Sequence, residues 1–225
     1  MTIEEAKIVV CDAGKRLLKE GLVARTWGNI SVRLNDREMV ITPSGKHYDD
    51  LQPDDMVLVN FKTNTASGIH KPSSEYKLHA AIYNSRSKVG SVIHTHQMNA
   101  STVAAAHREI PPILDDQAQL LGPSVRVAPY ALPNTKKLTN ATVKALKGRN
   151  AALMANHGAV CVGRDLEEAF VCCQVLEKAA KAFIEASFLG GAKSINKVEA
   201  WVMHKYYLMN YSKKAKNANG QGTKK

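Results

Sequence analysis

The sequence lacks a long apolar run and a leader-like start, and each absence excludes a class of protein. No stretch of about 18 or more consecutive apolar residues occurs, which is the length at which a transmembrane helix becomes a candidate. The N-terminus, MTIEEAKIVV, carries acidic residues early and has neither the basic start nor the cleavage site of a signal peptide. We therefore expect a cytoplasmic protein without a membrane partner.

Cysteine is scarce and poorly spaced for a disulfide or a structural zinc site. The four cysteines, Cys11, Cys161, Cys172 and Cys173, form no C-x-x-C pair, and the adjacent two rarely bridge each other in proteins. Reduced and mostly buried thiols are expected, as in other proteins of a reducing compartment.

Nucleotide-binding and nucleic-acid-binding signatures are missing as well. No G-x-G-x-x-G loop follows a predicted strand, which excludes the doubly wound dinucleotide-binding fold. The net charge of +11 would suit a nucleic acid. However, five of the lysines lie in the polar segment 212–225, which is predicted to be a disordered tail, and no stripe of alternating basic and aromatic residues occurs elsewhere. The surplus charge instead suits an acidic or phosphorylated small substrate.

The remaining residues, 1–211, predict a single α/β domain with no internal repeat. Strands and helices alternate without a regular βαβ period, and the early strands are joined by tight turns, which favours a layered α/β/α fold around a mixed, mostly antiparallel sheet. Helices are predicted over 2–20, 76–83, 97–107, 134–146, 166–189 and 198–209. The first would begin with a capping box at Thr2 and Glu5, the second with Ser73 or Ser74 as its cap, and the fourth with Asn134 or Thr135 as its cap. Strands are predicted over 29–34, 39–42, 56–61, 92–96, 125–127, 151–154 and 159–162.

Two histidines in the predicted strand 92–96 are the first sign of chemistry. Residues two apart on a strand share one face, so His94 and His96 stand about 7 Å apart at the backbone and can turn their imidazoles toward one metal ion. A hydrogen-bonded pair or a surface pair would have the same spacing. The strand pair alone therefore indicates a metal site without establishing one.

A distant histidine and a glutamate strengthen the metal interpretation. His157 lies at a turn before Gly158, where the small residue lets the backbone approach a site closely. A strand pair plus a third histidine matches catalytic zinc sites, which keep one position open. Glu75 lies at a predicted helix start, where its charge would stabilise the helix dipole. Alternatively, it binds the metal and moves protons as a general base. His79, one helical turn later, would support Glu75.

Three loops rich in small polar residues indicate a phosphate site. They are Trp27-Gly28-Asn29, Thr42-Pro43-Ser44-Gly45 and Ser73-Ser74, and the last opens a predicted helix. Helix N-termini and consecutive backbone N–H groups bind phosphate, although each loop would equally serve as an ordinary turn. Together with a metal site they suggest a phosphate ester held near a Lewis acid.

Taken in order, these motifs resemble the class II aldolase/adducin family. The resemblance rests on Gly28-Asn29-Ile30-Ser31, Thr42-Pro43-Ser44-Gly45, Ser73-Ser74-Glu75, His94-Thr95-His96 and Asn156-His157-Gly158. Within the family it is closest to the aldolases that cleave L-fuculose 1-phosphate. It implies a sheet of nine mostly antiparallel strands and a C4 homotetramer with its sites at subunit interfaces.

The resemblance also implies roles for individual residues. Zn²⁺, or another divalent ion such as Mn²⁺, Co²⁺ or Fe²⁺, would be bound by His94, His96, His157 and Glu75, and Glu75 would be the acid/base. The substrate phosphate would be held by Gly28, Asn29, Ser44, Gly45, Ser73 and Ser74. The implied reaction is the reversible cleavage of a ketose 1-phosphate to dihydroxyacetone phosphate and a short aldehyde such as lactaldehyde.

Two departures from the family pattern keep other reactions open. Asp115 stands where the fuculose-phosphate enzymes have a tyrosine. The aspartate would act as a second proton carrier, contact the aldehyde, or cap the following helix. The proton-donating tyrosine supplied by the neighbouring subunit falls near Tyr211, with Tyr206 and Tyr207 as competitors. The alternatives are a pentulose-phosphate 4-epimerase or a 3-oxo acid phosphate decarboxylase with the same metal site. A metal-free interaction domain like the adducin head is an alternative of another class.

Overall fold

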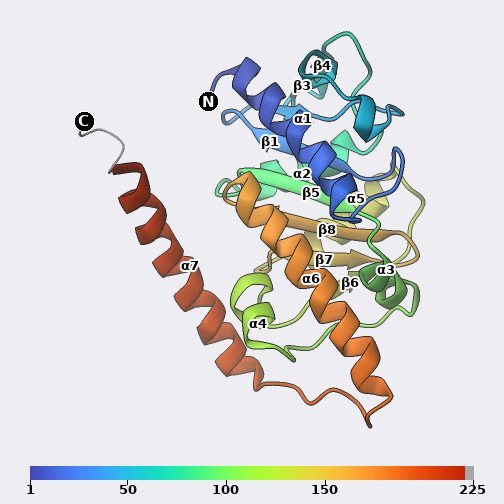
Figure 1. Ribbon diagram of the computed structural model, residues 1–225, viewed down its shortest axis with the longest axis vertical. Helices are drawn as coiled ribbons and strands as arrows, with labels where there is room; N and C mark the ends of the chain where they lie inside the picture. Colours follow the sequence, from blue (N-terminus) through green and yellow to red (C-terminus); the bar gives the residue numbers. More distant parts are fainter. Residues whose placement is uncertain (221–225) are drawn as a thin grey trace.

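An eight-stranded mixed sheet forms the centre of the protein in the computed structural model, which describes residues 1–220, with the side chains of residues 1–210 (Figure 1). The strand order is β4-β3-β2-β1-β5-β8-β7-β6. Every neighbouring pair is antiparallel except β6 and β7, which are parallel. The strands are β1 Asn29–Arg33, β2 Glu38–Ile41, β3 Val57–Asn60, β4 Thr65–Ser67, β5 Ser91–Thr95, β6 Arg126–Ala128, β7 Ala151–Met154 and β8 Gly158–Gly163.

Helices cover both faces of this sheet, which confirms the predicted three-layer α/β/α class. They are α1 Ile3–Lys19, α2 Tyr76–Ser85, α3 Met98–Ala105, α4 Asp115–Leu121, α5 Lys136–Ala145, α6 Leu166–Ser187 and α7 Lys197–Gly220. Short 3₁₀ turns occur at Tyr48–Asp50 and Pro53–Asp55. Helices α1, α3, α4 and α6 contribute to one apolar core, and α2 and α5 contribute to the other.

Alternation along the strands distributes the side chains between the two cores. Ile93 belongs to the core under α1 and α6, whereas its neighbour Val92 belongs to the core under α2 and α5. Leu153 and Met154 on β7 divide in the same way. A strand buried on both faces shows no alternation of apolar and polar residues, which is why β7 and β8 consist of continuous runs of apolar and small residues.

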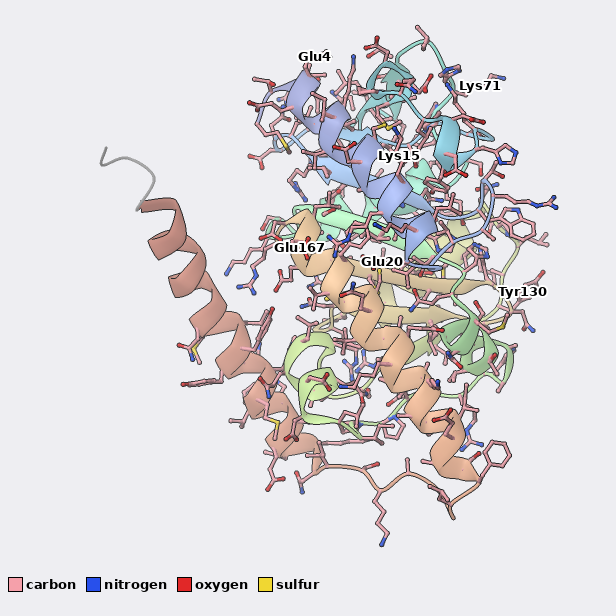
Figure 2. The ribbon with its side chains drawn as sticks, in the orientation of Figure 1. Glu4, Lys15, Glu20, Lys71, Tyr130 and Glu167 are labelled. Atoms are coloured by element: carbon pink, nitrogen blue, oxygen red, sulfur yellow. The ribbon has the colours of Figure 1, made fainter. Side chains whose placement is uncertain are left out.

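Helices α1 and α6 lie on the same face, and their ends meet. Figure 2 shows Glu20 at the end of α1 close to Glu167 in the first turn of α6. Arg16 joins them, with its guanidinium 2.7 Å from the Glu20 carboxylate and 2.5 Å from that of Glu167. These exposed pairs are worth little individually, so the positions of the two helices depend mainly on the apolar core to which both contribute.

The helix starts were predicted with mixed success. The capping box at Thr2 and Glu5 is confirmed, since the Thr2 hydroxyl accepts from the Glu5 N–H and the Glu5 carboxylate accepts from the Thr2 N–H. Thr135 caps α5, as expected. The prediction of Ser73 or Ser74 as the cap of α2 is wrong: the capping residue is Glu75, so α2 begins at Tyr76.

Three expectations about the elements need correction. The described residues form eight strands rather than nine. Residues 65–67, expected within a polar turn, pair with β3 as the short exposed edge strand β4. The last helix, expected to end near Met209, continues to Gly220. It therefore crosses the predicted start of the tail at residue 212. Residues 221–225 lie outside the described part, and the division into a domain of residues 1–211 and a tail stays a prediction.

The cysteines and the helices agree with two further expectations. Cys11, Cys161, Cys172 and Cys173 are all free and buried. Among the described residues, no helix has the length and apolar character needed to cross a membrane.

Candidate metal centre

The histidine pair lies at the end of a central strand. β5 is hydrogen-bonded to β1 on one side and to β8 on the other. His94 is fully buried as the next-to-last residue of β5, and His96 follows one residue after the strand ends. The two Nε2 atoms are 2.9 Å apart, so both rings turn toward one point, as their spacing predicted.

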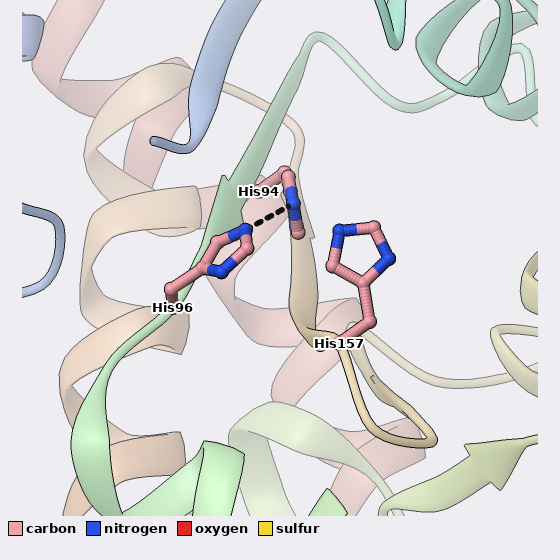
Figure 3. A group of neighbouring side chains, drawn as sticks. All are labelled: His94, His96 and His157. Carbon is pink, nitrogen blue, oxygen red and sulfur yellow. Dashed lines mark hydrogen bonds between the residues drawn. The ribbon is translucent and has the colours of Figure 1, made fainter. Parts of the chain in front are cut away.

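His157 joins this pair from the turn between β7 and β8. One ligand atom from each of the three histidines lies within 4.8 Å of the others (Figure 3). Gly158 makes the approach possible, because a Cβ at this position would overlap the Thr95 carbonyl oxygen and contact the rings of His94 and His96. The glycine predicted to allow close approach therefore packs against both other ligands.

Glu75 contributes a carboxylate to the same cluster. Its Oε2 lies 3.1 Å from Nε2 of His94, and its Oε1 lies 3.6 Å from Nε2 of His157. The Asn29 side-chain amide also donates to Oε2, at 3.2 Å. Asn29 is placed there by strand pairing, because it is directly opposite His94 in the β1–β5 ladder.

The charges of the cluster are coupled. Burial alone would raise the pKa of Glu75, but His94, His157 and the Asn29 amide hold that pKa well below its usual range. Burial and the neighbouring imidazoles lower the pKa of His96 to about 3 and also lower that of His157. For His94, burial opposes the charged form, yet the Glu75 carboxylate outweighs it and raises the pKa. The arrangement therefore combines one carboxylate anion with two imidazoles, those of His96 and His157, that favour the neutral, metal-binding form.

These residues fit a divalent metal ion. Two ligand atoms that each lie about 2.1 Å from one tetrahedral ion are about 3.4 Å apart. The separations of 2.9, 3.1 and 3.6 Å among His94, His96, Glu75 and His157 are close to that value. Nδ1 of His94 donates to the Ala159 carbonyl, at 2.8 Å, which leaves its Nε2 free to bind. Among the described residues, the buried Nδ1 of His157 has no hydrogen-bond partner.

The three predicted phosphate loops meet beside this cluster. Residues 42–44 and 71–73 pair through hydrogen bonds from the Ser44 N–H to Lys71 O and from the Ser73 N–H to Thr42 O, both 3.0 Å. The Thr42 hydroxyl accepts from the Ile30 N–H, which ties the loop of residues 42–45 to β1 next to Asn29. Gly28 must be glycine, because its φ is +86° and a Cβ would lie 2.7 Å from the His94 carbonyl oxygen.

Donors remain open in these loops. Within the described part of the chain, the N–H groups of Gly45 and Ser74 and the hydroxyls of Ser44 and Ser74 make no hydrogen bond. Ser73 is buried and accepts from the Glu75 N–H, so its own hydroxyl proton is unassigned. Asn29 differs from the others, since both ends of its side-chain amide already have protein partners.

Asp115 and the C-terminal tyrosines are not brought to the histidines within one chain. Asp115 opens α4, which packs against α6 and α7, and no hydrogen bond or ion pair among the described residues joins it to the cluster. Tyr206 is exposed on α7, while the Tyr207 hydroxyl donates to Glu168 on α6. The side chain of Tyr211 lies outside the described residues.

Sequence reasoning missed a set of polar residues behind Glu75. His79 was singled out as a support, but it acts through Asn29 rather than by direct contact, and the parts of Ser31 and Tyr83 were not foreseen. A signal was present, because Glu75, His79 and Tyr83 are spaced four apart and place polar groups on one face of α2.

Comparison with known proteins agrees with this geometry. The model of the class II aldolase and adducin N-terminal domain matches residues 8–184. The 5-deoxy-D-ribulose 1-phosphate aldolase of Bacillus thuringiensis serovar kurstaki is 31% identical, over 86% of this chain and 91% of the relative. A solved structure of L-fuculose 1-phosphate aldolase, 31% identical, has a TM-score of 0.86 and covers 90% of this chain and 96% of the other.

A relative with a different reaction is similar along its full length. The L-ribulose-5-phosphate 4-epimerase of Salmonella paratyphi C is 29% identical, over 95% of this chain and 98% of the relative. The proteins similar to this chain thus include enzymes of different specificity. The protein belongs to the class II aldolase and adducin family.

Proposed function

We propose that the protein is a metal-dependent aldolase that reversibly cleaves a ketose 1-phosphate to dihydroxyacetone phosphate and a short aldehyde. The observation that carries this proposal is the group of His94, His96, His157 and Glu75 beside loops with open N–H and hydroxyl donors. The loops would bind the ester phosphate, and the neighbouring metal site would bind the carbonyl group two bonds further along the sugar.

The metal ion is proposed to be Zn²⁺, held by the three histidines with the Glu75 carboxylate as fourth ligand. Imidazole nitrogens with a carboxylate also suit Mn²⁺, Co²⁺ or Fe²⁺, so the choice among ions is an experimental one. When bound, such an ion supplies Lewis-acid polarisation of the substrate carbonyl and stabilises the negative charge that develops on its oxygen.

The chain's own residues bind the phosphate and move the proton. Gly45, Ser44, Ser73 and Ser74, with Gly28 shaping the neighbouring turn, would hold the phosphate and supply binding energy away from the reacting carbons. Glu75 would deliver a proton to C3 of the cleaved three-carbon fragment, and it would remove that proton in the synthetic direction.

Glu75 is also suited to this task by its surroundings. It is largely buried, and it accepts a hydrogen bond from Asn29. When the C3–C4 bond breaks, the C4 hydroxyl becomes the aldehyde oxygen and gives up its proton. Tyr211 of a neighbouring subunit or Asp115 would take this proton and return it in the synthetic direction.

Two relatives support the proposed substrate class. One acts on 5-deoxy-D-ribulose 1-phosphate and one on L-fuculose 1-phosphate, and both names describe ketose 1-phosphates. Cleavage between C3 and C4 of either sugar gives dihydroxyacetone phosphate, and the other fragment is a two-carbon or a three-carbon aldehyde. We retain the fuculose type, with lactaldehyde as product, and place 5-deoxyribulose 1-phosphate next to it as a candidate.

A second candidate function is 4-epimerisation of a pentulose phosphate, and decarboxylation of a 3-oxo acid phosphate uses the same enolate chemistry. The epimerase relative is similar over 95% of this chain. The family resemblance itself is divided: it implies an aspartate in the region of Asp115 in the epimerases, and it also implies an aspartate in the epimerases where this chain has Glu75, which favours the aldolase. The non-catalytic reading, an interaction domain like the adducin head, is disfavoured by a complete ligand set.

The functional unit is proposed to be a cytoplasmic homotetramer with sites at subunit interfaces. Apolar side chains on α7 are exposed in the single chain, namely Val198, Trp201, Val202, Tyr206 and Met209. A helix face of this kind suits contact with a second copy, which would bring Tyr211 toward a neighbouring site. Light scattering on the purified protein tests the assembly, and a monomer that is fully active would contradict it.

The test of the proposed function is a coupled assay for dihydroxyacetone phosphate. The purified protein is offered a panel that includes L-fuculose 1-phosphate, 5-deoxyribulose 1-phosphate and L-ribulose 5-phosphate. Release of dihydroxyacetone phosphate from a ketose 1-phosphate supports the aldolase. Conversion of ribulose 5-phosphate to its 4-epimer without release would support the epimerase instead.

A further inference from the structure

A buried polar row connects Glu75 to the interior of the protein. On β1, Asn29 and Ser31 point to the same face, because residues two apart on a strand do so. On α2, Glu75, His79 and Tyr83 are four apart and share one side of the helix. Two strand residues advance about 6.7 Å and four helical residues about 6 Å, so the two rows keep register with each other.

The contacts follow that register. Asn29 donates to Glu75 at 3.2 Å and faces Nε2 of His79 at 2.5 Å. The Ser31 hydroxyl lies 2.6 Å from Nδ1 of His79 and 2.8 Å from the Tyr83 hydroxyl, which also donates to the Ser31 carbonyl. His79 and Ser31 have no exposed surface, and Asn29 is only 3% exposed, so water does not replace these bonds.

The position of each proton in this row is determined by its neighbours. The Glu75 carboxylate accepts hydrogen bonds only, so Asn29 must present its NH₂ group to Glu75 and its carbonyl oxygen to His79. His79 must then carry its proton on Nε2, and its Nδ1 accepts the Ser31 hydroxyl proton. Burial lowers the pKa of His79 to about 3, which keeps the ring neutral and limited to one donor and one acceptor.

We propose that His79 is a positioning residue for the acid/base Glu75: its Nε2–H fixes the Asn29 amide, and that amide fixes the orientation of the carboxylate. This inference rests on the proposed function, in which Glu75 binds the metal and moves the proton. It assigns the Asn29 side chain to Glu75 rather than to the substrate phosphate. A catalytic carboxylate held in this way loses little freedom when the reaction begins.

The kinetic test compares three variants of the full-length protein. His79→Leu removes both hydrogen bonds at similar volume, and we expect kcat to fall about 10- to 100-fold, as is usual for outer partners of metal ligands. KM for the ketose 1-phosphate should stay within about twofold, because the phosphate loops are untouched. His79→Gln retains a donor and an acceptor and should recover most of the lost kcat.

Tyr83→Phe is the matched control for general damage to the buried row. It removes a hydroxyl at the same depth but leaves the tautomer of His79 unchanged. It should reduce stability while kcat stays near that of the unaltered protein. Equal loss of kcat in Tyr83→Phe and His79→Leu, or a rise in KM in place of the fall in kcat, would overturn the proposal.

Two measurements are independent of turnover. In ¹⁵N-histidine NMR spectra of the unaltered protein, His79 should show a protonated Nε2 and an unprotonated Nδ1, and the opposite tautomer would overturn the assignment. In chelator competition with Zn²⁺, His79→Leu should bind about 10- to 100-fold more weakly than the unaltered protein and Tyr83→Phe should not. If no ketose phosphate is cleaved by any form, the proposed function fails while these two measurements still decide the role of His79.

Discussion

At the scale of single residues, the site is defined by which atoms are already bonded. Nδ1 of His94 is committed to the Ala159 carbonyl, and the Asn29 amide is committed to Glu75 and His79. The nitrogens that face Glu75 in the cluster are Nε2 of His94 and Nε2 of His157. Imidazole nitrogens gathered around one carboxylate form a group that can bind a metal ion.

Glu75 is the residue whose role is most directly testable. Glu75→Gln keeps the side-chain shape and one oxygen ligand but loses the proton-carrying carboxylate, so the metal content should stay largely intact. Turnover should drop about 100-fold or more. Metal analysis and the dihydroxyacetone phosphate assay measure the two quantities. Glu109→Gln, at an exposed carboxylate, is the control, and near-normal turnover of Glu75→Gln would refute the acid/base role.

Gly158 is the residue whose small size brings the strands around the site together. In Gly158→Ala, the added Cβ would overlap the Thr95 carbonyl oxygen and contact two histidine rings. We expect a loss of about 1–3 kcal/mol in the free energy of unfolding and weaker metal binding. Gly190→Ala, where no atom would contact the added Cβ, should leave metal binding unchanged. Urea unfolding and chelator competition provide the measurements.

At the scale of elements, the centre is built where a strand, a turn and a helix start meet. β5 lies in the middle of the sheet between β1 and β8, and its burial on both faces fixes its register. His157 lies in the β7–β8 turn, and Glu75 is the residue just before α2. Loop residues held by rigid elements in this way are typical of catalytic sites.

Helix α6 depends on a buried carboxylate at its start. Glu168 accepts from the N–H and the guanidinium of Arg164, and its side chain is almost fully buried. Burial would raise the pKa of Glu168, yet the bonds from Arg164 keep that pKa below its ordinary value. A carboxyl with a lowered pKa stabilises the fold at neutral pH, and this contribution is lost as the pH falls through the folded-state pKa.

The consequence is a pH-dependent effect of Glu168→Gln. This variant should lose about 1.5–3 kcal/mol of unfolding free energy at neutral pH, the usual worth of hydrogen bonds to a charged group. The difference from the unaltered protein should shrink as the pH falls below about 4.3, the ordinary pKa of a glutamate in the unfolded chain, and through the lower folded-state pKa. Urea unfolding at both pH values measures it. Glu185→Gln, at an exposed carboxylate, should show little effect at either pH, and a constant difference for Glu168→Gln would contradict the assignment.

At the scale of the whole molecule, the metal ligands join distant parts of the chain. Glu75, His94, His96 and His157 come from segments before α2, at the end of β5 and between β7 and β8. An ion bound by them would stabilise the folded state in proportion to its affinity, because the unfolded chain does not hold these groups together.

Removal of the metal should therefore lower both activity and stability. Chelation is expected to abolish cleavage and to lower Tm, since an ion at about 100 times its Kd contributes about 2.7 kcal/mol. Adding back Zn²⁺ should restore both quantities. His157→Ala is the control: this variant lacks one proposed metal ligand, so its Tm should change little when chelator or Zn²⁺ is added. Full activity of a protein shown to contain no divalent metal would remove the mechanism.

The sequence by itself determined the layered α/β class, most strands and the His94–His96 pair. Local patterns suffice for these features, because apolar runs, turns and the His-x-His spacing act over a few residues. The full set of proposed metal ligands came from the resemblance of separate motifs to one family. The short edge strand β4 and the length of α7 were not predictable in this way. An exposed three-residue strand has no hydrophobic pattern, and a helix that continues into polar residues has no end signal.

Only the tertiary structure decided how the ligands are arranged and supported. Strand pairing places Asn29 opposite His94, and the register between β1 and α2 joins Glu75 to His79 and Ser31 through Asn29. The partners at the site lie far apart in the sequence, with 46 positions between Asn29 and Glu75 and 65 between His94 and Ala159. Sequence spacing predicts which residue types are present, whereas packing between elements determines which of their atoms remain free for chemistry.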